Sequence, residues 1–182
     1  MLSTIRVLML FLTFTTANFA IAVGADEFMA GPVIKNYGKH AKVQQDFNFD
    51  KNSVFKVAFD IGEQGKIGEV NRKFETLARF INMHVANGMS AKNIHLALVV
   101  HGKAGFDLLK GPLYQEKFQQ KNSNSALLQD LMKNQVRVYL CGQSAAYYEI
   151  SNSMLAPGVE MALSAMTAHA VLQSKGYKVN PF

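Results

Sequence analysis

Apolar runs rich in β-branched residues alternate with amphipathic segments along residues 53–182, and this alternation constrains the fold more strongly than any other feature. Residues 93–100, NIHLALVV, are almost wholly apolar, as are strands that a parallel sheet buries on both faces. From Ile67 to Ile81, apolar residues recur at steps of three and four, which indicates an amphipathic helix. The alternation predicts an α/β domain at residues 53–182, with a mostly parallel five-stranded sheet covered by helices on both faces.

The individual elements follow from the same patterns and from the turn residues between them. Strands are expected at residues 54–61, 93–100, 136–140, 159–163 and 177–179. Helices are expected at residues 67–87, 106–109 and 124–134, from residue 144 onwards, and up to residue 175 before a glycine stop. Residues 111–121 are polar and irregular, and they predict a flap over a crevice.

The first 52 residues have a different character from the rest of the chain. Residues 1–25 predict a secretory signal peptide, because a basic start and an apolar run precede the small residues Val23-Gly24-Ala25. Cleavage there predicts a periplasmic protein without stable membrane insertion; an uncleaved anchor is the alternative. Residues 26–52 form an arm without regular periodicity. The arm is either a loose tail or a packed segment, and its apolar residues favour packing: Phe28, Val33, Ile34, Tyr37 and Phe47.

Composition and motifs exclude several classes of function. Lys and Arg number 19 against 13 Asp and Glu, for a net charge of +6, but the basic residues are spread out and tryptophan is absent. Nucleic acid is therefore not an expected partner. His84, His95, His101 and His169 fall in separate elements without metal-ligand spacing, and His84 and His169 are expected on helix surfaces or in satisfied core positions. No metal, nucleotide or other cofactor is predicted.

The only cysteine, Cys141, is the best candidate for a functional group. It follows the apolar run Val136 to Leu140 and precedes Gly142-Gln143-Ser144, which reads as a strand, a tight turn and the start of a helix. Free N–H groups at a helix N-terminus favour a thiolate, and α/β sheets bind ligands at the carboxyl ends of their strands. The alternative is a buried cysteine that only packs.

Two further strand ends should meet Cys141 at one edge of the sheet. One carries Asp60, and the other carries His101 followed by Gly102. Gly102 lets the backbone approach the site closely, as Gly142 does after Cys141. His101 could act as a base or as a charge partner of the thiolate, or it could bond a backbone carbonyl and only shape its loop. Ser144 is most simply a helix N-cap, although its hydroxyl could instead bond the sulfur of Cys141.

Three motifs, in this order, resemble the DsrE/DsrF-like family and its exported branch of uncharacterised proteins. They are Val99-Val100-His101-Gly102, Val138-Tyr139-Leu140-Cys141-Gly142-Gln143-Ser144-Ala145 and Leu155-Ala156-Pro157-Gly158-Val159-Glu160-Met161-Ala162. The first helix, with Glu69-Val70-Asn71, and the arm segment Gly31-Pro32-Val33-Ile34 also fit that branch. The resemblance covers residues 55–182.

The resemblance implies a three-layer α/β/α sandwich that assembles into homotrimers or homohexamers. It also implies that Cys141 carries sulfur as a persulfide, as cytoplasmic relatives do, exchanging it with a donor or acceptor that is a protein or a small sulfur compound. His101 would orient or buffer the site, which would include Asp60, Asn71, Gly102, Gly142, Gln143 and Ser144. The alternatives are an oligomeric binding module in which Cys141 is structural, and a thiol redox sensor that forms an intermolecular disulfide.

Overall fold

The computed structural model describes residues 27–180, so the predicted signal peptide at residues 1–25 lies outside the described part of the chain. The sheet contains five strands, β1 (Phe55–Ile61), β2 (Ile94–Val100), β3 (Arg137–Cys141), β4 (Val159–Ala162) and β5 (Lys178–Asn180). The strands lie in the order β4-β3-β2-β1-β5, and all four pairings are parallel. The predicted α/β fold with five strands is confirmed, and the described sheet is wholly parallel.

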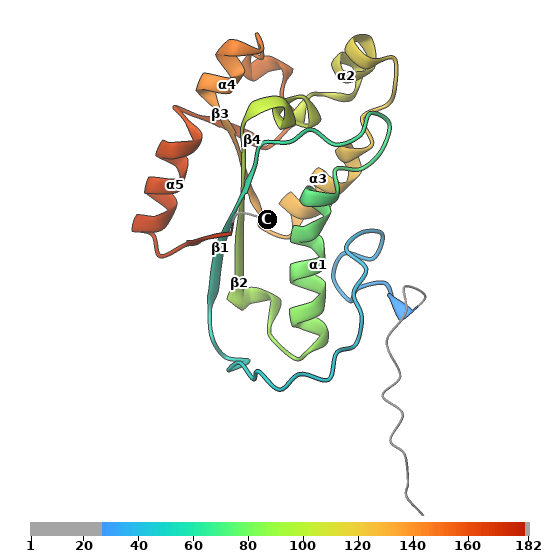
Figure 1. The fold of residues 1–182 in the computed structure, drawn as a ribbon, viewed down its shortest axis with the longest axis vertical. Helices are drawn as coiled ribbons and strands as arrows, with labels where there is room; N and C mark the ends of the chain where they lie inside the picture. Colours follow the sequence, from blue (N-terminus) through green and yellow to red (C-terminus); the bar gives the residue numbers. More distant parts are fainter. Residues whose placement is uncertain (1–26, 181–182) are drawn as a thin grey trace, which may run out of the picture.

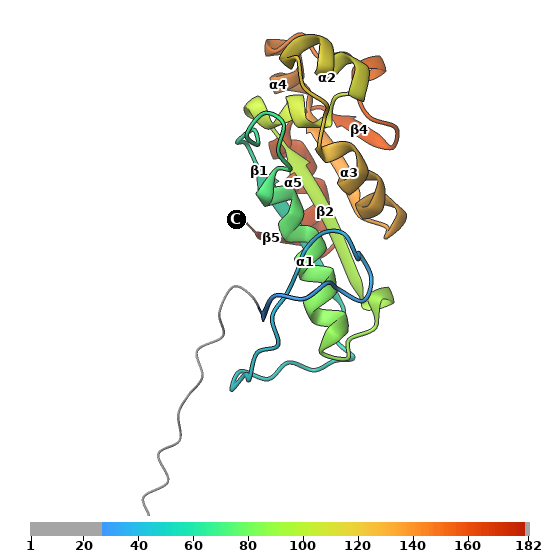
Figure 2. The same ribbon diagram turned by 90° about the vertical axis from the view of Figure 1, so that its right-hand side faces the viewer.

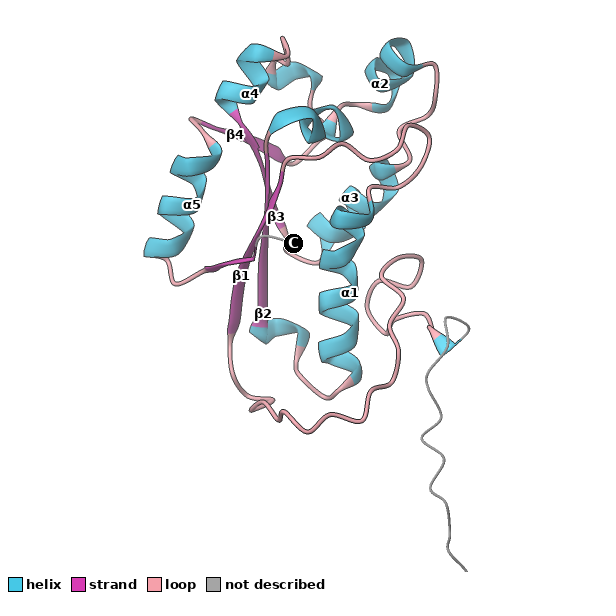
Figure 3. Cartoon of the chain, viewed as in Figure 1, coloured by secondary structure: helices cyan, strands magenta, loops and turns pink. Residues whose placement is uncertain are grey.

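Helices cover both faces of this sheet, so the predicted three-layer sandwich is also confirmed (Figures 1 and 3). One face carries α1 (Arg72–Ala86) and α3 (Asn124–Lys133), and the other carries α5 (Ala165–Ser174). The remaining helices are α2 (Gly111–Phe118), α4 (Gly142–Tyr147) and the 3₁₀ turns η2 (Ala91–Asn93), η3 (Gly102–Leu108) and η4 (Asn152–Met154). Figure 2 shows α2 and α4 beyond the end of the sheet at which β2 and β3 finish.

Two cores of unequal size lie on the two faces. The larger core contains Phe59 of β1 and Leu98 of β2 packed with residues of α1 and α3 such as Phe74 and Leu127. The smaller core, next to α5, is built mainly from small residues: Ala58, Ala97, Val99, Ala168 and Leu172. Neighbouring residues of a strand point to opposite faces, which is why adjacent positions such as Ala58 and Phe59 belong to different cores.

Two predictions about local structure are wrong. The expected flap at residues 111–121 is largely the helix α2, because Pro112 in its first turn favours helical backbone and because Tyr114 is buried against Phe118. The first helix begins at Arg72 rather than at residue 67. Asn71 is its N-cap, since the Asn71 side chain accepts a hydrogen bond from the Lys73 N–H.

The arm packs along α1 instead of forming a loose tail (Figure 1). Asn82 of α1 is fully buried, and its amide accepts hydrogen bonds from the N–H groups of Val33 and Ile34. The same amide donates to the carbonyl groups of Ile34, Tyr37 and Gly38. A single polar side chain therefore fixes a full turn of the arm.

Within residues 27–180, no helix is both long enough and apolar enough to span a membrane.

Candidate functional site

The site is built on the face of the sheet that α5 covers. Three strand residues pack in or against the smaller core on this face: Ala58, Val99 and Tyr139. Asp60, His101 and Cys141 each stand two positions later in the chain, and β1, β2 and β3 are neighbours in the sheet. Because side chains two positions apart share a face, the strand pattern delivers all three side chains to the α5 side at one end of the sheet.

A cavity of about 320 Å³ collects these side chains. It is lined by residues of the strand ends, of α4 and of α5: Asp60, His101, Cys141, Gln143, Ser144, Ser164, Ala165, Met166 and His169. The cavity thus lies outside the carboxyl ends of parallel strands, where open α/β sheets bind their ligands. Three of the six residues proposed as binding residues line the cavity: Asp60, Gln143 and Ser144. Two more, Gly102 and Gly142, directly follow lining residues in the sequence.

Cys141 is the last residue of β3 and the N-cap of α4, and it is only 6% exposed. Burial raises the pKa of its thiol, but hydrogen bonds to the sulfur outweigh burial and leave the pKa below its usual value. The groups that lower this pKa are the N–H and hydroxyl of Ser144 and the N–H groups of Ala165 and Gln143. Donors that bond the charged form favour a thiolate, so the site is suited to a nucleophilic sulfur.

Ser144 is not a helix N-cap, because α4 begins two residues earlier and Cys141 itself occupies the cap position. The Ser144 hydroxyl oxygen accepts a hydrogen bond of 2.9 Å from the N–H of Gly102, and the Ser144 side chain also helps to lower the pKa of the Cys141 thiol by hydrogen bonding. The serine therefore connects the loop after β2 to the thiol, which is the second of the two roles that the sequence left open.

A carboxylate joins two histidines beside the thiol. Nε2 of His169 lies 2.8 Å from Oδ1 of Asp60, and Nε2 of His101 lies 3.4 Å from Oδ2 of the same group. The Asp60 side chain is 35% exposed and that of His169 only 15%. His101 thus contacts a carboxylate through its ring, and only its backbone N–H bonds a carbonyl, that of Ile61.

The family is decided by the sequence beyond the arm, where residues 66–181 match the model of the DsrE/DsrF-like family. The chain belongs to the DsrE/DsrF-like family. A solved protein of unknown function from Methanobacterium thermoautotrophicum has a similar fold, with a TM-score of 0.50, 16% identity and coverage of 70% of this chain and 99% of its own. The ychN protein from E. coli gives a TM-score of 0.48 and 22% identity over 70% of this chain and 100% of its own. No curated protein matches the chain.

In this DsrE/DsrF-like chain, two glycines allow the strand-end loops to approach each other. A Cβ atom on Gly102, whose φ is +54°, would lie 2.8 Å from the carbonyl oxygen of Gly62. A Cβ atom on Gly142 would lie 2.6 Å from the carbonyl oxygen of Ala162. Both contacts are shorter than a side chain tolerates, so these glycines shape the backbone around the thiol. Gln143 donates a hydrogen bond of 3.2 Å to the carbonyl of Leu163 across the rim.

The cavity lacks one residue that the sequence predicts for the site and contains another that it does not predict. Asn71 does not line the cavity; it is buried at the start of α1 and donates to the carboxylate of Asp107. His169 lines the cavity, although it was expected on a helix surface or in the core. The position of Asp60 in its strand could have indicated this partner. Asp60 points to the face of the sheet that α5 covers, so a side chain of that helix can reach its carboxylate.

Among residues 27–180, no group of three or more histidine, cysteine, aspartate or glutamate side chains could hold a metal ion.

Proposed function

We propose that this DsrE/DsrF-like protein is a sulfur carrier in which Cys141 accepts, holds and passes on sulfane sulfur as a persulfide. One observation carries the proposal: the single cysteine lies in a cavity at the carboxyl ends of the strands, and neighbouring hydrogen-bond donors lower the pKa of its thiol despite burial. A low thiol pKa increases the thiolate fraction at neutral pH, and the thiolate is the attacking form.

The transfer step needs no external oxidant or reductant. The Cys141 thiolate attacks the terminal sulfur of a donor persulfide, so a new S–S bond forms while the donor's S–S bond breaks. The bonding electron pair leaves with the donor sulfur, which departs as a thiolate. The reverse step passes the sulfur to an acceptor. The N–H groups near residues 142–145 stabilise the anionic sulfur, and His101 orients the site and exchanges protons with the thiol groups.

The presence of a single cysteine supports a sulfur carrier rather than an enzyme that forms or isomerises disulfides. An enzyme that forms or isomerises disulfides normally uses a second thiol to release its mixed disulfide, and this sequence has only one cysteine. A carrier needs only one, because the same sulfur accepts and donates the sulfane atom.

The protein is further proposed to act outside the cytoplasm as a homotrimer or homohexamer. Export rests on the leader-like residues 1–25, and assembly rests on the family resemblance. N-terminal sequencing of the periplasmic protein should find Asp26 or a residue close to it, whereas an intact Met1 in the membrane fraction contradicts export. Light scattering at micromolar concentration should give a trimer or larger, and a monomer contradicts assembly.

Intact mass spectrometry after exposure to polysulfide or thiosulfate tests the carrier function. The wild-type protein should gain whole sulfur atoms that dithiothreitol removes, and Cys141→Ser should gain none. The Ser144→Ala variant is a matched control, because it keeps the thiol and removes one of its donors; it should load more slowly but still load. If the wild-type protein gains no sulfur, the carrier function is wrong.

The competing function is a binding module in which Cys141 only packs, and the low exposure of Cys141 favours it. Iodoacetamide distinguishes the two. A carrier should react in the folded state, whereas a packed cysteine should react only after denaturant is added. A redox sensor would instead give a disulfide-linked dimer on a non-reducing gel.

A further inference from the structure

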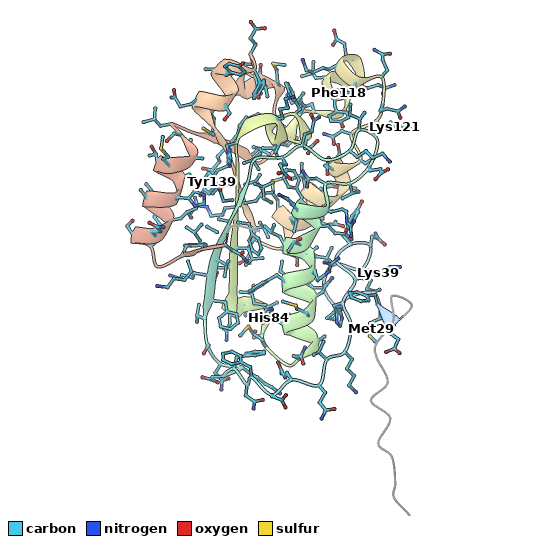
Figure 4. The ribbon with its side chains drawn as sticks, in the orientation of Figure 1. Met29, Lys39, His84, Phe118, Lys121 and Tyr139 are labelled. Atoms are coloured by element: carbon cyan, nitrogen blue, oxygen red, sulfur yellow. The ribbon has the colours of Figure 1, made fainter. Side chains whose placement is uncertain are left out.

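A second cavity lies at the opposite end of β1 from the thiol. Its volume is about 480 Å³, and it lies between the arm and the C-terminal half of α1. Phe55, the first residue of β1, lines this cavity, whereas Asp60 near the end of the same strand lines the cavity of Cys141. Figure 4 labels His84 near the lower end of α1, and Lys39 on the arm beside that helix.

This cavity depends on the part of the chain that precedes the family domain. Seven lining residues belong to the arm: Phe28, His40, Ala41, Val43, Gln45, Phe47 and Phe49. The match to the family begins only at residue 66, so one wall of the cavity comes from a segment outside it. Asn82 fixes the adjacent turn of the arm on α1 with five hydrogen bonds, which gives that wall a firm attachment.

Part of the cavity wall is an uncharged aromatic cluster. The rings of Phe49, Phe55 and His84 contact one another, with centroid distances of 5.9 Å between the phenylalanines and 5.5 and 5.3 Å from them to the histidine. Burial lowers the pKa of His84, and its Nδ1 lies 2.7 Å from the carbonyl oxygen of Phe80. The histidine therefore contributes a neutral ring, and Met83 adds a flexible apolar side chain to the same wall.

The charge at the cavity is of one sign. Arg79 contributes a guanidinium group, and none of the described lining residues is an aspartate or a glutamate. Nε of Arg79 donates a hydrogen bond of 2.9 Å to the carbonyl of Lys39, which fixes the side chain against the arm. Within residues 27–180, Arg79 forms no ion pair, so its other N–H groups are available to an anion.

From these features we propose that the cavity binds an amphiphilic carboxylate, an aliphatic chain whose acid group is held by Arg79. The chain would lie against the ring cluster and Met83, and the carboxylate would accept hydrogen bonds from the guanidinium. The volume falls within the range of about 300–1,000 Å³ typical of small-molecule sites, which combine apolar walls with a few polar groups. The site is separate from Cys141 and does not depend on sulfur carriage.

Calorimetric titration with dodecanoate and with the uncharged dodecan-1-ol, both below their aggregation limits, tests the proposal. The wild-type protein should bind dodecanoate about tenfold or more tightly than the alcohol, since hydrogen bonds to charged groups are the stronger kind. Arg79→Gln should remove most of this preference, while Arg72→Gln, the same change at the other end of α1, should retain it. Failure of the wild type to bind dodecanoate, or equal binding of the two ligands, overturns the proposal.

Two further variants test the proposal in more detail. One tests whether the preference for the acid comes from the charge of Arg79 or from its contact with the arm, and the other tests whether the ligand lies in this cavity. Arg79→Lys keeps the positive charge and should keep a preference for the acid; if it loses the preference as completely as Arg79→Gln, the arm contact and not the charge is responsible. Ala41→Trp should fill the cavity and weaken both ligands. If Ala41→Trp melts like the wild type but binds dodecanoate equally well, the ligand lies elsewhere and the proposal is wrong.

Discussion

Two aspartates, one near the end of the strand β1 and one after β2, have opposite environments. Asp60 at the end of β1 is partly exposed, and among residues 27–180 its carboxylate forms polar contacts with the two histidines that share the thiol cavity. Asp107, in η3 after β2, is fully buried and accepts hydrogen bonds of 2.7 Å from the Gly65 N–H and 2.8 Å from the Asn71 amide. The difference separates a carboxylate that is open to chemistry from one that holds loops together.

The Asp107 region is a buried polar cluster, defined here as Asp107, Asn71, Asn122 and Asn124. Asn122 donates to the backbone carbonyls of Asp107 and Leu109, and the side chain of Asn124 accepts from the Asn71 N–H at 2.7 Å. The cluster thus connects the loop after β1, the start of α1, η3 and the start of α3. Buried polar networks of this kind fix loop positions, because each unmade bond is costly.

Asp107→Ala should produce the largest effect on stability. It leaves the part-buried Gly65 N–H and the buried Asn71 amide without their acceptor, and a fully buried unsatisfied donor costs about 1–3 kcal/mol. We expect the free energy of unfolding in urea to fall by about 2–4 kcal/mol, whereas Asp60→Ala should lower it by less than about 1 kcal/mol. Equal losses in the two variants would remove the distinction between the two aspartates.

The same contrast predicts a pH dependence of stability. Burial raises the pKa of Asp107 above its ordinary value of 3.8, despite the hydrogen bonds that lower it. A carboxyl group with a higher pKa in the folded state takes up a proton on folding between its two pKa values. The free energy of unfolding should therefore fall as the pH rises through that window and stay level, as far as this group is concerned, above it.

Urea denaturation across this pH range checks the expectation, with Asp107→Asn as the matched variant. The amide cannot titrate, so the part of the fall that belongs to Asp107 should disappear, while Asp60→Asn should leave it in place. A wild-type stability that rises from pH 4 upwards with an unchanged slope in Asp107→Asn contradicts a raised pKa for Asp107.

Ser144→Ala should produce an intermediate effect, which is measured at the thiol, although the substitution also removes the acceptor of the Gly102 N–H. The substitution removes the hydroxyl that donates to the Cys141 sulfur and leaves the backbone donors in place. We expect the iodoacetamide alkylation rate of the folded protein at pH 7 to fall by about three- to tenfold, in line with about 1 kcal/mol for a partly screened hydrogen bond. Ser125→Ala, on the surface of α3, is the control and should leave the rate unchanged. No change in Ser144→Ala would mean that the backbone donors alone hold the thiolate.

The fold was largely predictable because local patterns and topology agree. The five apolar runs identify five strands, and the helices between them make every connection a parallel crossover. The missed helix α2 illustrates where local patterns fail: residues 111–121 are polar, and the burial of Tyr114 that anchors α2 depends on contacts with other segments. Likewise, the arm shows no periodicity because Asn82, far away in the sequence, provides its hydrogen bonds.

The candidate site was predictable in part, for a related physical reason. Strand ends and the turn after Cys141 follow from short sequence patterns, so Asp60, His101 and Cys141 could be placed at one edge. The role of Ser144 depended on where α4 begins, a difference of two residues that sequence cannot resolve. His169 was missed because it comes from a helix whose relation to the strand ends is purely tertiary.

Substitutions of the two histidines should produce the smallest effects. These effects show how His101 and His169 influence the reactivity of Cys141 through Asp60. His169 holds Asp60 at 2.8 Å and is the more buried histidine, whereas His101 lies at 3.4 Å and is more exposed. Losing His169 therefore leaves the Asp60 charge less compensated beside the thiolate. We expect His169→Ala to slow alkylation of Cys141 by up to about threefold and His101→Ala by less, since exposed charges are well screened.

Double variants with Asp60→Asn test whether the histidines act through this carboxylate. If they do, neither histidine substitution should change the alkylation rate further once Asp60 is neutral, which a double-mutant cycle measures as full coupling. The pH profile of alkylation should shift in His169→Ala relative to the wild-type protein. The profile of the double variant should match that of Asp60→Asn alone. A His101→Ala effect that is larger than that of His169→Ala and persists in Asp60→Asn would instead show that His101 acts on the thiol directly. In that case His101 would be the charge partner of Cys141, and Asp60 would only position it.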